Sequence, residues 1–108
     1  MKIKLIYPEW GNYPLLYRRY IPTLGIITVA SLTPPEIDIS ITDERIEPID
    51  FSEDADLVGI STMTCQSKRA YEIARIYKER GATVVLGGVH PSLLPEEASN
   101  FCDAVVVG

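Results

Sequence analysis

Two continuous apolar runs constrain the fold of this chain more than any other feature: ADLVGIST at 55–62 and ATVVLGG at 82–88. Short runs without alternating polar residues are typical of strands that are buried on both faces. The segment between them, 66–81, carries apolar residues at the i, i+3, i+4, i+7 spacing of an amphipathic helix and ends at Gly81. A strand, a helix and a strand in this order predict a parallel βαβ unit with a right-handed crossover.

The segments on either side extend this unit. The run 2–8 is apolar and closed by a proline, which predicts a strand, and the alternation in 36–44 predicts a half-buried edge strand. Residues 22–33 start with Pro22 and stop before two further prolines, as a helix does. We also expect a long loop over 9–20, a short helix or turn over 91–101 and a final strand over 102–108.

The order of these elements indicates an α/β fold. Five strands alternating with helices predict one flavodoxin-like (Rossmann-like) domain over 1–108, with a five-stranded parallel sheet in the order 2-1-3-4-5 and helices on both faces. Ligands of such sheets bind beyond the carboxyl ends of the strands, near the switch point between the first and third strands. Three loops are therefore candidates for a site: 7–14, 61–67 and 87–92.

Composition and charge narrow the possible partners. The formal net charge of −5 and the pI near 4.8 argue against nucleic acid, because phosphate binding needs a basic face. No apolar run approaches the roughly 20 residues of a membrane span, and the N-terminal segment is too short for a signal peptide. Cys65 and Cys102 form no disulfide framework and no CxxC metal pair, so a reduced, cytoplasmic setting is expected. One predicted helix carries a basic cluster that we interpret as a solvated face: Lys68, Arg69, Arg75, Lys78 and Arg80.

The loop after the third predicted strand offers several polar groups where a helix begins. Ser61, Thr62 and Thr64 carry hydroxyl groups, and Gln66 carries an amide. Free backbone N–H groups and the helix dipole favour a phosphate or another polar acceptor at such a position. The alternative is that Thr64 or Ser67 only caps the helix.

Two glycines and the only histidine follow the fourth predicted strand. Gly87 and Gly88 remove side chains from the mouth of the sheet, so a flat or bulky ligand can approach the backbone. They lack the spacing of a dinucleotide or phosphate-loop motif, which argues against NAD and ATP. His90 either hydrogen-bonds locally or touches the ligand, and the local role is favoured.

Four segments together resemble the N-terminal cobalamin-binding domain of B12-dependent radical SAM proteins: PTLGIITVAS, DADLVGISTMT, VVLGGVHPSLLPEE and DAVVVG. The likeness covers nearly the whole chain, and its most specific part is GGVHPSLLPEE with the strand before it. Ser61–Met63 resembles the S-x-L element of cobalamin domains. In that family this serine and the residue four positions later lie near the buried nucleotide tail of the cofactor, and the double glycine lets the tail pass.

The resemblance implies that cobalamin lies across the carboxyl edge of the sheet, with its lower base threaded between sheet and helix. It implies no catalytic residue in this chain. The cofactor contacts that it implies are Pro8 and Trp10 after the first strand, Thr23, Leu24 and Gly25 in the first helix, Ser61, Thr62, Met63, Thr64 and Cys65 after the third strand, and Gly87, Gly88 and His90 after the fourth.

Two family motifs are missing. The loop 7–14 has no D-x-H-x-x-G motif, whose histidine ligates cobalt from below in other cobalamin domains, so base-off, His-off cobalamin without a metal ligand from this chain is implied. The C-x-x-x-C-x-x-C motif of a [4Fe–4S] cluster is also absent, so we expect a domain truncated from a longer radical SAM protein. S-adenosylmethionine and the cluster would belong to the radical SAM domain of the same chain. The domain alone is not expected to be an enzyme; the parent protein would transfer methyl groups or carry out oxidative ring chemistry on a tetrapyrrole.

Two other hypotheses remain open. A flavodoxin-like domain without a cofactor would serve as a docking or dimerisation module, which the missing axial histidine and the acidic charge motivate. A small hydrolase or transferase would use Ser61 or Cys65 with His90, but Met63 replaces the second glycine of a G-x-S-x-G motif. We interpret Cys65 as a packed thiol, because no resolving cysteine or convincing base accompanies it.

Overall fold

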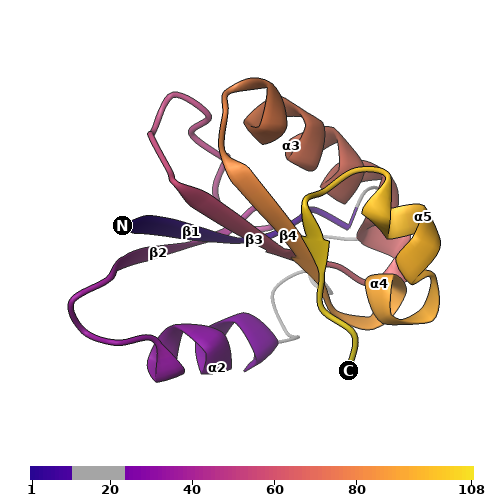
Figure 1. Cartoon of the computed structure of the whole chain (residues 1–108), viewed down its shortest axis with the longest axis horizontal. Coiled ribbons are helices and arrows are strands. Elements are labelled where there is room, and N and C mark those ends of the chain that lie inside the picture. Colours follow the sequence, from indigo (N-terminus) through magenta and orange to yellow (C-terminus); the bar gives the residue numbers. More distant parts are fainter. Residues whose placement is uncertain (11–23) are drawn as a thin grey trace.

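The computed structural model describes residues 1–10 and 24–108, and in this part of the chain it has five parallel strands in the order β2-β1-β3-β4-β5 (Figure 1). The predicted fold class and strand order are therefore confirmed. The strands are β1 (Lys2–Tyr7), β2 (Asp38–Asp43), β3 (Leu57–Ser61), β4 (Thr83–Gly87) and β5 (Ala104–Val105), and the helical elements are α2 (Leu24–Leu32), the 3-10 turn η1 (Thr64–Gln66), α3 (Ser67–Glu79), α4 (Val89–Leu93) and α5 (Pro95–Ser99).

One face of the sheet is closed over its central strands β3 and β4. Alternate residues of β3 and β4 point to this face, among them Ile60 and Leu86, and they are almost inaccessible to solvent. Ile73 and Tyr77 of α3 and Ala98 of α5 pack against them in one core cluster. Figure 1 shows α3 on this side of the sheet and α2 on the other.

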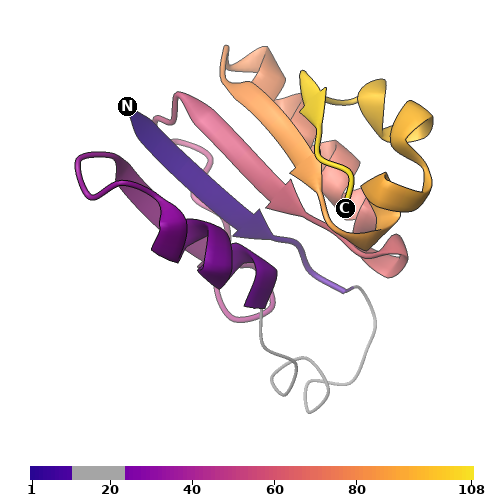
Figure 2. The ribbon, with the colours of Figure 1, turned by 60° about the horizontal axis from the view of Figure 1, so that its bottom comes forward.

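The opposite face is covered only in part. Leu5, Tyr7 and Trp10 pack with Ile26 of α2 in a second, smaller cluster over β1 and β2. Figure 2 shows α2 lying along that side, with the C-terminus in front of the far strands of the sheet. Val85 of β4, whose side chain points to the same face, keeps partial exposure. The sheet therefore has one closed face and one half-open face.

Several predicted boundaries shift. The last strand pairs only over Ala104–Val105 instead of 102–108, and the expected single segment 91–101 forms two short helices. Leu94 interrupts them with φ −129° and ψ 61°, and Pro95 then starts α5, where its missing N–H costs nothing. The helix expected over 22–33 is described from Leu24, because residues 11–23 lie outside the described part.

The predicted edge strand is correct, but its burial is not as expected. β2 lies at the edge of the sheet, and its only buried residue is Thr42 rather than an isoleucine. Ile41 is 40% exposed, since α2 covers only part of this face. No helix in the described ranges 1–10 and 24–108 has the length and apolar character needed to cross a membrane.

Replacing a buried leucine and an exposed leucine by alanine should have very different effects on stability. Leu86→Ala is expected to lower the free energy of unfolding by about 2–5 kcal/mol, because Leu86 is completely buried between sheet and helices. Leu32→Ala, at a leucine that is 79% exposed at the end of α2, should change it by less than about 0.5 kcal/mol. Urea denaturation followed by circular dichroism measures both. Equal losses for the two variants would contradict the placement of the core.

Candidate functional site

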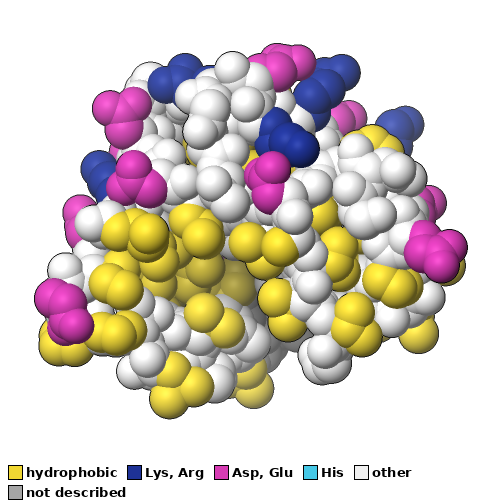
Figure 3. Space-filling model, in the orientation of Figure 1, with side chains coloured by type: hydrophobic (Ala, Val, Ile, Leu, Met, Phe, Trp, Pro, Cys, Tyr) yellow, Lys and Arg dark blue, Asp and Glu magenta, His cyan; other side chains and the backbone are white. Residues whose placement is uncertain are grey.

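A groove runs along the half-open face of the sheet, from Leu57 at the start of β3 to the carboxyl ends of the strands. Its volume is about 360 Å³, and apolar groups form most of its wall. Figure 3 shows hydrophobic side chains gathered around a hollow between α2 and the C-terminal segment. The lining residues are Leu5, Leu57, Gly59, Ile60, Ser61, Val85, Gly87 and Gly88 from the sheet and its loops, Gly25, Ile26 and Val29 from α2, and Val106 and Gly108.

Two glycines on neighbouring strands keep the floor of this groove low. Gly59 of β3 pairs with Val85 of β4, and Gly87 follows Val85 on the same face. A Cβ at Gly59 would lie 2.9 Å from Leu5 Cδ2, so the leucine side chain already occupies that space. A Cβ at Gly87 would lie 3.6 Å from the Val106 Cβ, an ordinary contact distance. The Leu5 side chain therefore forms the floor over Gly59 and backbone forms it at Gly87, and an apolar floor of this kind suits a flat or extended apolar ligand.

The mouth of the groove is built by two loops that are bonded to each other. The Thr62 N–H donates to the Gly87 carbonyl (3.0 Å), and the His90 N–H donates to the Thr62 carbonyl (3.1 Å). Gly88 has φ +99°, and a Cβ there would lie 2.9 Å from both the N and O atoms of Thr62. Gly88 is thus required both by its conformation and by the close approach of the two loops.

The loop after β1 joins the same assembly through Gln66. The fully buried amide of Gln66 donates from Nε2 to the Pro8 carbonyl (2.6 Å) and accepts at Oε1 from the Met63 N–H (2.8 Å). The alternative that Thr64 or Ser67 caps the helix is wrong, because the Gln66 side chain accepts at the start of η1 and neither of the other two side chains caps α3. The amide that looked available for a ligand is consumed internally.

His90 is the buried centre of a polar cluster, with its side chain only 6% exposed. Its Nδ1 lies 3.2 Å from Thr64 Oγ1, and its Nε2 lies 2.7 Å from Glu97 Oε2 and 3.1 Å from the Tyr71 hydroxyl. Tyr71 donates to the same carboxylate oxygen at 2.7 Å, and its ring stacks on Phe101 with a centroid distance of 4.0 Å. Both ring nitrogens of His90 are therefore engaged, and none of these bonds goes to Ser61 or Cys65.

Contacts within this cluster shift the pKa values of Glu97 and Tyr71 in opposite directions. Hydrogen bonds from Tyr71 and His90 hold the pKa of Glu97 below its usual value. Burial, together with the hydrogen bond and negative charge of Glu97, raises the pKa of the Tyr71 hydroxyl well above its ordinary range. Around neutral pH, Glu97 is an acceptor only and Tyr71 is a donor to it.

The structure brings only some of the predicted contacts into the groove. Gly25, Ser61, Gly87 and Gly88 line it. The other predicted residues lie elsewhere: Pro8, Trp10, Thr62 and His90 are buried, Met63 packs against the cluster under α2, Leu24, Thr64 and Cys65 are exposed, and Thr23 lies outside the described residues.

Trp10 and Cys65 have opposite environments, and only that of Cys65 contradicts its sequence interpretation. Trp10 is 7% exposed and donates from Nε1 to the Tyr7 hydroxyl (3.2 Å), while the Arg45 guanidinium lies 5.4 Å from its ring centroid and pairs with Asp43. This tryptophan is packed rather than presented at the surface. The packed thiol predicted at Cys65 is wrong, since Cys65 is exposed on η1.

Sequence reasoning missed the middle of the groove, above all Gly59, Val85 and Val29. A signal for two of them was present. In a strand, alternate residues share a face, so Gly59 and Ser61 in one apolar run and Val85 and Gly87 in the other point the same way. The position of Val29 depends on how α2 packs, which the sequence alone does not give.

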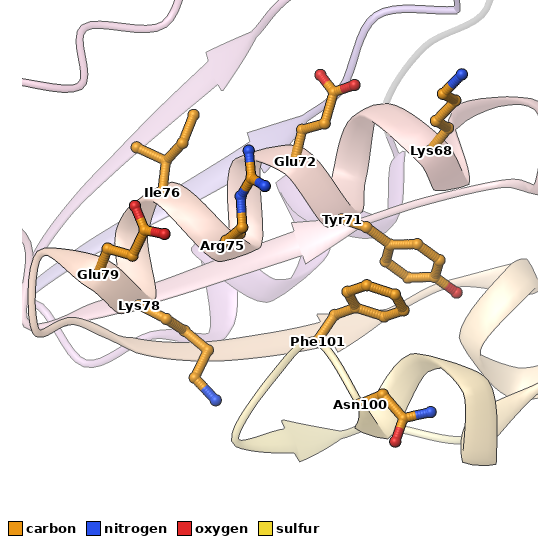
Figure 4. A pocket seen from close by; sticks show the side chains of 9 residues that line it. All are labelled: Lys68, Tyr71, Glu72, Arg75, Ile76, Lys78, Glu79, Asn100 and Phe101. Atoms are coloured by element: carbon orange, nitrogen blue, oxygen red, sulfur yellow. The ribbon is translucent and has the colours of Figure 1, made fainter.

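A larger hollow lies on the other side of the molecule. It measures about 860 Å³ and runs along the outer surface of α3 beside Asn100 and Phe101 (Figure 4). Its walls carry Lys68, Arg75 and Glu79, charges of both signs on an exposed helix. Size alone favours this hollow, but we regard the smaller groove as the site. The groove is apolar and reaches the carboxyl ends of the strands, where ligands of this fold bind.

Two residues of the basic cluster, Arg69 and Lys78, form ion pairs. Arg69 forms a two-pronged contact with Glu44, with the shortest distance 2.6 Å, and also contacts Glu72 at 3.1 Å. Lys78 lies 3.6 Å from Asp103. Within residues 1–10 and 24–108, no cluster of three or more His, Cys, Asp or Glu side chains is arranged to hold a metal ion.

Residues 19–108 match the B12 binding domain family, which is five-sixths of the chain, and the parallel sheet in the order 2-1-3-4-5 fits that family's fold. The chain therefore belongs to the B12-binding domain family. No solved structure gives a significant match.

The relatives are methyltransferases. Bacteriochlorophyllide d C-8(2)-methyltransferase of Chlorobaculum tepidum is 49% identical over 86 residues, and the C-12(1)-methyltransferase of the same organism is 41% identical over 88 residues. Each alignment covers 79% of this chain and 19% of the relative. An uncharacterized methyltransferase of Pyrococcus horikoshii is 36% identical over 100 residues, covering 81% of this chain and 22% of that protein. The chain thus spans about a fifth of the length of the relatives it matches.

Placing a side chain at Gly88 should disrupt the mouth of the groove. Gly88→Ala is expected to cost about 1–3 kcal/mol in the free energy of unfolding, because of the positive φ and the close approach of Thr62. Gly25→Ala is the matched control: its Cβ meets nothing within 4 Å, and alanine is preferred in a helix, so stability should rise by roughly 0.5–1 kcal/mol. Thermal unfolding compares the two variants, and a neutral Gly88→Ala would contradict the geometry described.

The His90 cluster predicts a pH dependence at its carboxylate. Because the pKa of Glu97 is lowered in the folded state, its contribution to stability is complete above the unfolded-state pKa and is lost as pH falls through the folded-state pKa. The wild type should therefore lose more stability below about pH 4.5 than Glu97→Gln does. Urea midpoints between pH 3 and pH 7 measure this difference. Glu96→Gln, at an exposed residue of the same helix, should keep the acid dependence of the wild type.

Proposed function

We propose that the groove binds the nucleotide tail of cobalamin, and that the loops at its mouth face the corrin. The observation that carries this proposal is the apolar channel floored by Gly59 and Gly87, which starts at the carboxyl ends of the strands and continues between the sheet and α2. The family match supports the same ligand. Gly25, Val29, Ser61, Val85 and Gly88 would then contact the tail. Cobalamin supplies cobalt-centred group transfer, while this chain supplies position and exclusion of water.

The environment of His90 supports a base-off, His-off cofactor, in which no histidine of this chain ligates cobalt. The chain has one histidine, and the buried ring of His90 is bonded to Thr64, Tyr71 and Glu97. Freeing either nitrogen for cobalt would break the hydrogen bonds that this nitrogen makes in the cluster and would require the buried ring to move. An apolar channel is also the environment that a displaced lower base needs.

We further propose that the chain works with a radical SAM domain of a longer protein, which would hold S-adenosylmethionine and a [4Fe–4S] cluster. The length of the methyltransferase relatives supports a further domain, and their names favour methyl transfer over oxidative ring chemistry. A surface for such contact exists on α2, where Leu24, Ile27 and Leu32 are 65%, 49% and 79% exposed. A helix that is apolar on all sides is usually covered on all sides. A reducing, cytoplasmic setting stays a prediction from the two free cysteines, Cys65 and Cys102.

The exposed apolar surface of α2 favours a second candidate function, docking or dimerisation without a cofactor. This candidate predicts that the thermal stability of the chain does not respond to cobalamin. The two functions differ in what the groove does, so a binding experiment separates them.

Titration with hydroxocobalamin tests the proposal. We expect a change in the visible spectrum, co-elution on gel filtration, and stabilisation by about 2.7 kcal/mol at a ligand concentration of 100 times the dissociation constant. Gly87→Val should weaken binding at least about tenfold, because its Cβ fits beside Val106 while its methyl groups occupy the groove. Thr83→Val, in the same strand but away from the groove, should bind like the wild type.

Two outcomes would contradict the proposal. No spectral change and no co-elution would favour the docking function. Equal affinities for the Gly87→Val and Thr83→Val variants would show that cobalamin binds elsewhere on the chain.

A further inference from the structure

The His90 cluster joins side chains from three helical elements at one buried ring. The imidazole reaches η1 through Thr64, α3 through Tyr71 and α5 through Glu97, while the backbone of the same residue bonds to Thr62. Thr62 in turn lies against Gly88 at the mouth of the groove. A single side chain outside the groove is thus connected to both loops that line its mouth.

The bonding partners fix the tautomer of the ring. A carboxylate only accepts, so Glu97 requires a proton on Nε2, which also lies within reach of the Tyr71 oxygen. In the neutral ring Nδ1 is then an acceptor, and the Thr64 hydroxyl donates to it. Glu97 thereby orients the ring, and the ring orients the first residue of η1.

Rigid packing supports the cluster from outside. Tyr71 is held between Glu97 and the stacked ring of Phe101, whose interplanar angle with Tyr71 is 8°. The His90 side chain has 6% exposure, so water competes little for its hydrogen bonds. Losing the imidazole would leave a void under the loop and would remove the hydrogen bonds that connect Thr64 with Glu97 and Tyr71.

We propose that His90 is a positioning residue for the mouth of the groove: through Nδ1 and Thr64 it holds the loop after β3 against the loop after β4. This inference deepens the proposed function and rests on it for its effect on cobalamin. The Nε2 side, with Glu97 and Tyr71, sets the tautomer and orientation, whereas the Nδ1 side transmits the constraint to Ser61 and Thr62.

Amide hydrogen exchange tests the inference without any ligand. In His90→Ala, the Thr62 N–H should exchange at least about tenfold faster relative to the Val58 N–H in the middle of β3, because only the mouth is released. Ile73→Val, a core substitution away from the loops, should lower the protection of both amides together. If the ratio of Thr62 to Val58 exchange is unchanged in His90→Ala, the inference is overturned.

Affinity for hydroxocobalamin gives the second readout. His90→Ala should raise the dissociation constant at least about tenfold, whereas Ile73→Val should change it less than about twofold. His90→Asn, whose amide oxygen can replace the Nδ1 acceptor, should recover most of the affinity, and Glu97→Gln should lose an intermediate amount. Equal affinities for the His90→Ala and Ile73→Val variants would overturn the positioning role.

The two proposals fail differently. If the wild type does not bind hydroxocobalamin, the proposed function fails, and the exchange ratio still decides whether His90 positions the loops. If the wild type binds and all the His90 variants bind equally well, only the positioning role fails. Should His90→Ala not fold, His90→Asn and Glu97→Gln carry the same comparison.

Discussion

The arrangement of the groove depends on the backbone of one residue, Thr62. Its N–H is bonded to the Gly87 carbonyl, its carbonyl accepts from the His90 N–H, and Gly88 lies so close that no side chain fits between them. These contacts extend the pairing of β3 and β4 past the ends of the strands, where backbone groups would otherwise face a ligand or water. Gln66 connects the loop after β1 to the loop after β3, because its Nε2 donates to the Pro8 carbonyl. The three loops are therefore one structure rather than three independent segments.

The two faces of β3 and β4 do different work because strand residues alternate. Ile60 and Leu86 point toward α3 and make the core, while Gly59, Val85 and Gly87 point toward the groove. Along the same two strands, one set of alternate residues therefore belongs to the core and the other set lines the groove. This explains how a chain of 108 residues can leave one sheet face partly open and still bury a contiguous core.

The sequence was sufficient for the strand order and for two sides of the groove, because both follow from local periodicity and from glycine positions. It was insufficient where the outcome depends on packing between distant segments. The His90 cluster draws Thr64, Tyr71 and Glu97 from three elements, and no spacing rule relates them. The Gln66 amide was interpreted as a group of the candidate site for a related reason. A polar side chain beside a predicted site is equally consistent with binding a ligand and with capping a turn. The length of β5 was overestimated because three consecutive valines, which favour a strand, do not supply a partner for their backbone groups.

The charge pattern of the groove bears on how it would recognise its ligand. None of the residues that line it within the described part of the chain carries a charged side chain, and the chain as a whole is acidic. Affinity for an extended ligand with a phosphodiester would therefore come from apolar burial along the channel and not from ion pairing. Such a site discriminates by shape and length, since a shorter ligand would leave the channel near Leu57 and Val29 unfilled. In that proposal the binding energy depends on how firmly the loops after β3 and β4 are held together, which is the role proposed for the buried His90.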